Sequence, residues 1–123
     1  MVSRFVVHRH KTARPHFDLR LIEEGVLRCW SLLKELPSQT GEQRLAIERE
    51  SAAPDSACGA SLERDAFGEG KVYLWDEGEV DIKVSTPRKL VLEFTGKKLA
   101  GSYELLRMLW YPGNRWLLRK SSF

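Results

Sequence analysis

The sequence has few cysteines and no long hydrophobic run, and each scarcity excludes a class of protein. Its 123 residues include two cysteines, Cys29 and Cys58, too few for the disulfide framework of a small secreted domain. We therefore expect a reducing, cytoplasmic location. No apolar stretch approaches the roughly 20 residues that a membrane-spanning helix needs, and the first residues show no signal-peptide pattern. The sequence thus predicts a protein with no membrane partner.

Several motifs that would define a reaction are also missing. There are no paired cysteines, no His-Glu-x-x-His pattern, no glycine-rich phosphate loop and no Gly-x-Ser-x-Gly turn. A nucleophilic Ser/His/Asp arrangement has no support either. The three histidines of the chain, in contrast, all lie between His8 and His16. Site chemistry is therefore expected in this short stretch.

Length and composition predict a single domain over residues 1–123. Hydrophobic residues make up 42% of the chain, enough for one modest core. Short β-branched and aromatic segments recur and are separated by turn residues such as Glu24-Gly25 and Glu77-Gly78. The expected strands are 4–8, 17–22, 26–30, 44–47, 71–75, 80–85, 90–94, 103–106 and 116–118. We predict an all-β fold, a small closed or partly open antiparallel barrel. A minor helix could occur at 31–36 or in the irregular stretch 51–69.

The formal net charge of +3 is small but unevenly distributed. The first twenty residues contain one acid, Asp18, and five bases: Arg4, Arg9, Lys11, Arg14 and Arg20. This distribution suits a region that holds a phosphate, but charge alone favours a solvated basic face.

The second strand-like segment alternates between apolar and polar residues. If it is a strand, His16, Asp18 and Arg20 point to the same face, about 6–7 Å apart. His8 and His10 share a face of the preceding strand by the same rule. Two imidazoles and a carboxylate form a suitable shell for a divalent metal, and an arginine beyond them suits an anion bound to that metal. The pattern alone equally suits an ordinary half-buried strand.

Longer stretches resemble a known family. Phe5-Val-Val-His-Arg-His10 and Ala13-Arg-Pro-His-Phe-Asp-Leu-Arg-Leu21 resemble the opening signature of the 3′-phosphoesterase domain of bacterial DNA ligase D and its stand-alone relatives. The resemblance continues in order through 25–34, 44–47, 68–76, 92–101 and 116–120. It implies a small β-barrel hydrolase of DNA repair by non-homologous end joining. Such domains remove 3′-phosphates from DNA ends and trim terminal ribonucleotides, usually with manganese.

The same resemblance implies roles for individual residues. The family's metal ligands correspond to His10, His16 and Asp18. Its residues for the phosphate reaction correspond to Arg20, Lys34 and Arg44. The two arginines would offset charge on the phosphate oxygens, and the lysine would add a point charge or assist the leaving oxygen. The expected cofactor is a divalent metal, manganese first, with zinc or another divalent ion as an alternative.

The chain departs from the family pattern in three places, one of which is the loop before Gly68, where it reads Leu62-Glu-Arg-Asp-Ala-Phe67. After the strand at 44–47 the family has a phosphate-holding histidine and a tyrosine, whereas this chain reads Ser51-Ala-Ala-Pro-Asp-Ser-Ala57. Because His8 shares a strand face with His10, we consider it a candidate replacement for that histidine. The family's N-terminal arm, which is tied to ribonucleotide trimming, is reduced to four residues before Phe5. We therefore do not expect trimming.

Three functions stay open at this point. The first is a 3′-phosphatase for primer–template duplex ends, with a separate DNA ligase or polymerase as a candidate partner. The second is a catalytically reduced or inactive module of the same fold that binds DNA ends. The third is a non-haem iron oxygenase, because His16-x-Asp18 resembles half of a facial triad. No histidine follows His16, which disfavours this third function.

Overall fold

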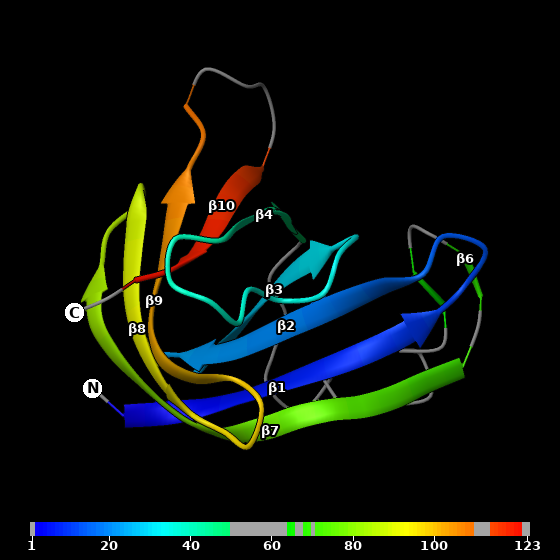
Figure 1. Ribbon diagram of the computed structural model, residues 1–123, viewed down its shortest axis with the longest axis horizontal. Helices are drawn as coiled ribbons and strands as arrows, with labels where there is room; N and C mark the ends of the chain where they lie inside the picture. Colours follow the sequence, from blue (N-terminus) through cyan, green and yellow to red (C-terminus); the bar gives the residue numbers. More distant parts are fainter. Residues whose placement is uncertain (1, 50–63, 66–67, 70, 110–113, 122–123) are drawn as a thin grey trace.

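The computed structural model describes residues 2–49, 64–65, 68–69, 71–109 and 114–121, and its regular structure in those ranges consists of β-strands alone. Eight antiparallel strands close into a barrel in the order β1-β2-β3-β4-β10-β9-β8-β7 (Figure 1). They are β1 (Val2–Lys11), β2 (His16–Glu23), β3 (Val26–Leu32), β4 (Gln43–Glu48), β7 (Lys71–Ser85), β8 (Lys89–Thr95), β9 (Ala100–Arg107) and β10 (Arg115–Lys120). The predicted all-β barrel is confirmed. The connection at 31–36 is extended and bent, not helical.

A second, two-stranded sheet pairs β5 (Arg64–Asp65) with β6 (Gly68–Glu69). It falls in the stretch 51–69 that the sequence predicts to be irregular, so that stretch contains a short pair of antiparallel strands. The remainder, including residues 51–57 where the family's histidine and tyrosine are missing, lies outside the described residues. Among the residues described, no helix is long and apolar enough to cross a membrane.

β7 is one continuous strand where the sequence predicts two. Glu77-Gly78 was expected to form a turn, but Gly78 lies inside β7, opposite Phe5 of β1. A Cβ atom on Gly78 would lie 2.5 Å from the carbonyl oxygen of Thr95. The glycine therefore permits close packing of β7 against β8. The predicted turn is wrong because a glycine at a tight contact and a glycine in a turn look alike in a sequence.

Side chains fill the interior of the barrel. Trp30 and Trp116 are at most 1% exposed and meet edge to face with ring centroids 5.9 Å apart. Trp75 is only partly buried and packs at the margin of the core with Phe17. A filled interior leaves the outer face of the strands, and the ends of the barrel, for a functional site.

A tight hairpin sets the pairing of β2 with β3. The chain turns through Glu24 and Gly25, which both have positive φ angles, 50° and 77°. Two such residues form a turn whose twist matches that of the strands it joins. The resulting register places Asp18 opposite Ser31, a pairing that organises the site described next.

Candidate metal centre

The register of three neighbouring strands gathers polar side chains on the outer face of the barrel. His10 lies directly opposite His16, and His8 lies opposite Asp18. Asp18 in turn lies opposite Ser31 of β3. Directly opposite residues of an antiparallel pair project to the same face, with Cβ atoms about 4.5–5.5 Å apart. The β1–β2 pairing therefore brings both histidines of β1 to the polar face of β2.

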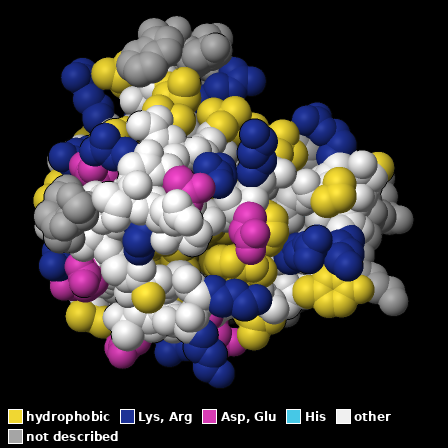
Figure 2. All heavy atoms as spheres, viewed as in Figure 1, with side chains coloured by type: hydrophobic (Ala, Val, Ile, Leu, Met, Phe, Trp, Pro, Cys, Tyr) yellow, Lys and Arg dark blue, Asp and Glu magenta, His cyan; other side chains and the backbone are white. Residues whose placement is uncertain are grey.

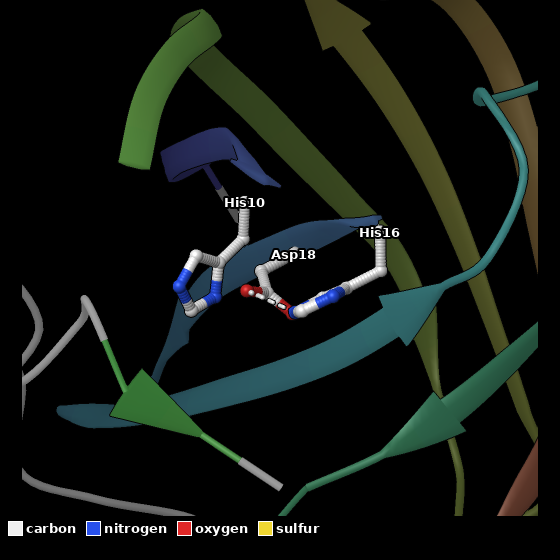
Figure 3. Close-up of side chains that lie close together, drawn as sticks. All are labelled: His10, His16 and Asp18. Carbon is white, nitrogen blue, oxygen red and sulfur yellow. Dashed lines mark ion pairs between the residues drawn. The ribbon is translucent and has the colours of Figure 1, made fainter. Parts of the chain in front are cut away.

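His10, His16 and Asp18 form a compact cluster (Figure 3). One candidate ligand atom from each residue lies within 4.8 Å of the other two. The side chains are buried, with exposed fractions of 0%, 1% and 4%. In the described part of the chain this is the one such group of histidine, cysteine or acidic residues. Burial of a carboxylate is costly unless an opposite charge or hydrogen bonds compensate.

The turn before β2 orients the imidazole of His16. The Thr12 hydroxyl donates to the carbonyl oxygen of Arg14 at 2.8 Å and accepts from the Arg14 N–H at 3.1 Å. The same carbonyl oxygen lies 2.9 Å from His16 Nδ1. Because a carbonyl can only accept, Nδ1 carries the proton, and in the neutral imidazole Nε2 then keeps its lone pair. That lone pair is then available to the cluster.

Ser31 orients the carboxylate of Asp18. Its hydroxyl donates to Asp18 Oδ1 at 2.6 Å, and the other oxygen, Oδ2, lies 3.4 Å from His16 Nε2 (dashed line in Figure 3). Both of these facing atoms offer lone pairs, which repel each other unless a cation or a proton lies between them. The donor set therefore fits a divalent metal ion.

His8 and Arg20 flank the cluster on the same face. Burial, and after it the nearby Arg20 guanidinium, lowers the pKa of His8, against the opposing effect of Asp18. His8 Nδ1 and Arg20 Nε are buried and have no hydrogen-bond partner within the described residues. Buried polar atoms without a partner are uncommon in folded proteins. Their position beside the cluster suits a bound anion.

Lys34 and Arg44 lie in a neighbouring cleft of about 260 Å³. Ser31 also lines this cleft, so the serine is common to the cleft and the cluster. Lys34 is exposed. The Arg44 guanidinium donates to the carbonyl oxygen of Glu35 and to the carboxylate of Glu42, both at 3.0 Å. The structure thus separates the predicted site residues into the cluster of His10, His16 and Asp18 and an adjoining cleft that contains Lys34 and Arg44.

Comparison with known proteins identifies the family. The family model for the DNA ligase D 3′-phosphoesterase domain matches residues 8–107. The chain belongs to this family. The match covers the whole cluster and the adjoining cleft, so the resemblance seen in the sequence is confirmed.

Relatives of the phosphoesterase domain are parts of longer proteins. The multifunctional non-homologous end joining protein LigD of Mycobacterium bovis is 33% identical over 121 residues, which cover 94% of this chain and 16% of that protein. LigD of Mycolicibacterium smegmatis is 30% identical over 130 residues, covering 96% and 17%. LigD of Pseudomonas aeruginosa is 30% identical over 126 residues, covering 96% and 15%. The chain thus spans about a sixth of the length of these relatives.

Two residues of this phosphoesterase-family site escaped the sequence analysis. Arg49 Nε donates to Ser31 Oγ at 3.1 Å, so hydrogen bonds run from Arg49 through Ser31 to Asp18. Alternation with Trp30 could have placed Ser31 on the outer face, but only the strand register shows which residue it meets. Arg49 lies beyond the predicted strand 44–47, and a main-chain hydrogen bond to Cys29 holds it beside β3. No sequence signal indicated its place.

Proposed function

We propose that this member of the 3′-phosphoesterase family removes phosphate from DNA 3′ ends, using a divalent metal held by His10, His16 and Asp18. The observation that carries the proposal is the convergence of buried, lone-pair-bearing ligand atoms in a chain of this family. The names of the relatives refer to non-homologous end joining. The proposed substrate is therefore a broken duplex that ends in a 3′-phosphate.

The metal ligands are oriented before any ion binds. His16 would present Nε2, because its Nδ1–H is committed to the Arg14 carbonyl. Asp18 would present Oδ2, because Oδ1 accepts from Ser31. Hydrogen bonds of this kind, from neighbouring residues to the ligand side chains, fix the orientation of the ligands and raise metal affinity. A divalent ion there supplies polarisation of a phosphate oxygen and a lowered pKa of bound water, and manganese is the ion we propose.

Cationic side chains would hold the phosphate. Arg20 Nε has no partner within the described residues, and a guanidinium pairs well with phosphate oxygens. His8 lies opposite Asp18 and would contact the same group from β1. Lys34 and Arg44 would hold the preceding part of the strand in the cleft that shares Ser31 with the cluster. These positive groups offset the charge that develops during hydrolysis.

The setting of this reaction is also proposed. The chain has two cysteines, too few for a disulfide framework, so we propose a reducing compartment, the cytoplasm. A separate DNA ligase or polymerase would act on the 3′-hydroxyl that phosphate removal leaves.

The test uses a primer–template duplex ending in a 3′-phosphate. Purified protein is incubated with manganese, and released phosphate is measured for the unmodified chain and for His16→Ala. The same duplex ending in a 3′-hydroxyl serves as the substrate control. Release that requires manganese and His16 supports the proposal. Absence of release while manganese still binds contradicts it and favours a module that binds DNA ends without hydrolysis.

A further inference from the structure

The strands of the metal centre carry a second group of side chains on their opposite face. Along β1, Arg9 alternates with His8 and His10, so it points away from the metal centre. Arg9 lies directly opposite Phe17 of β2 and Tyr73 of β7. Because opposite residues share a face, these three side chains form a row across three strands.

Each cation of this group lies over an aromatic ring. The distances to the ring centroids are 5.9 Å for Arg9 over Phe17, 5.2 Å for Lys11 over Tyr73 and 5.1 Å for Lys98 over Trp75. The rings of Phe17 and Trp75 meet edge to face, with centroids 5.8 Å apart. We call this set the cation–aromatic face: Arg9, Lys11, Phe17, Tyr73, Trp75 and Lys98.

The cation–aromatic face is open to solvent and carries positive charge. Arg9, Lys11 and Lys98 are exposed, and Tyr73 keeps 44% of its surface accessible. Within the described residues, none of the three cations forms an ion pair with a carboxylate. Figure 2 shows Lys and Arg side chains beside hydrophobic ones over the ends of β1, β2 and β7 on the right. The face therefore offers exposed rings and un-neutralised charge together.

We propose that the cation–aromatic face binds an unpaired DNA strand. Aromatic rings stack on bases of any sequence, and neighbouring cations hold the phosphates, which is how many single-strand binding proteins work. In the free protein, Lys11 and Lys98 lie over Tyr73 and Trp75. An incoming base would take the ring face, and the displaced ammonium would move to the adjoining phosphate. A duplex does not fit this chemistry, because its bases already stack on one another.

This inference deepens the proposed function, on which it rests for the identity of the nucleic acid. The 3′ end would lie at the metal centre on one face of the β1–β2–β7 ribbon. The unpaired part of the template strand would lie on the other face. Such an arrangement favours a recessed end, where a single strand continues past the site of reaction, over a blunt end.

The test measures the fluorescence anisotropy of a labelled oligodeoxythymidine with unmodified protein and with four variants, two of them controls. Tyr73→Ala removes a stacking ring and Lys11→Gln removes a charge, and each is expected to weaken binding roughly tenfold. Val84→Ala and Lys83→Gln change exposed residues at the other end of β7 and are expected to bind as the unmodified chain does. Equal binding by all four variants overturns the inference. Duplex DNA bound as tightly as the single strand through Tyr73 and Lys11 also overturns it.

Two further measurements separate this inference from the proposed function. His16→Ala should bind the single strand normally, because it changes only the metal face. Tyr73→Ala should release phosphate normally from a blunt 3′-phosphate end, because no unpaired strand is present. An active phosphatase without Tyr73-dependent strand binding contradicts the inference alone. Tyr73-dependent strand binding in a protein that never releases phosphate contradicts the proposed function alone.

Discussion

The hydroxyl of Ser31 donates a 2.6 Å hydrogen bond to Asp18 Oδ1, and this contact decides which carboxylate oxygen faces the histidines. The other oxygen, Oδ2, lies 3.4 Å from His16 Nε2. A serine on the neighbouring strand thus prepares a ligand pair for a cation.

Removing the Ser31 hydroxyl should weaken metal binding without unfolding the chain. In Ser31→Ala the Asp18 carboxylate can rotate. Loss of a hydrogen bond that orients a metal ligand lowers metal affinity about tenfold or more. Calorimetric titration with manganese measures the effect. Ser102→Ala is the matched control, since its hydroxyl donates to Glu93 of β8 at 2.8 Å. Equal manganese affinity in both variants would contradict the role given to Ser31.

Arg49 should serve the phosphate rather than the metal. Its Nε donates to Ser31 at 3.1 Å, which directs the guanidinium to the site. Arg49→Lys keeps the charge but loses the planar fork of donors that matches phosphate. We expect phosphate release to fall at least roughly tenfold, because each donor to a developing oxyanion contributes strongly, with little change in manganese affinity. Arg88→Lys, on an exposed turn, is the control. Parallel losses of affinity and rate would point to a structural role instead.

His8 should be needed for hydrolysis and dispensable for metal binding. It lies opposite Asp18 but outside the three-residue cluster. His8→Ala should therefore abolish phosphate release while manganese binds as before. Single-turnover release and a manganese titration on the same preparation provide the two readouts. A fully active His8→Ala protein would refute the idea that His8 replaces the family's missing histidine.

Asp76 should stabilise the fold in a pH-dependent way. Burial alone would raise its pKa, but the N–H groups of Leu99, Lys98 and Lys97 donate to the carboxylate and hold the pKa below its usual range. A pKa lowered by folding contributes stability above the unfolded-state pKa near 4, and that stability is lost as the pH falls through the folded-state pKa. Asp76→Asn should lower the free energy of unfolding by about 2 kcal/mol at pH 7.

Urea unfolding of Asp76→Asn at pH 7 and at pH 3 checks this expectation. The loss of unfolding free energy relative to the unmodified chain should shrink at pH 3, because this pH lies below the unfolded-state pKa near 4 and closer to the lowered folded-state pKa. Glu79→Gln, an exposed change on the same strand, should show no deficit at either pH. A deficit of the same size at both pH values would contradict the assignment to the carboxylate.

Much of the barrel follows from local patterns. Alternation placed His16, Asp18 and Arg20 on one face of a strand, and the structure agrees. Strand alternation is a local property, since neighbouring side chains point to opposite faces whatever the partner strand. The continuous strand β7 could not be predicted from local patterns. Gly78 is required by its close approach to Thr95, which lies seventeen residues later in the chain.

The features of the site that could not be predicted from the sequence depend on contacts between strands. The pairing of His10 with His16 depends on the β1–β2 register, and the contact of Ser31 with Asp18 depends on the β2–β3 register. The basic N-terminal stretch looked like one positive region. The structure divides it, with Arg20 beside the His10, His16 and Asp18 cluster and Arg9 on the cation–aromatic face. A charge count along a chain cannot separate the two faces of a sheet.

Manganese binding to Asp18→Asn is the measurement that tests the central claim most directly. Calorimetric titration of the unmodified chain should show a single strong site, because Asp18 supplies the one carboxylate of the cluster. Asp18→Asn keeps the size of the side chain but removes its charge, and strong binding should disappear. Asp81→Asn, a half-buried aspartate of β7, should bind as the unmodified chain does. Strong manganese binding that survives Asp18→Asn would contradict the proposed metal centre.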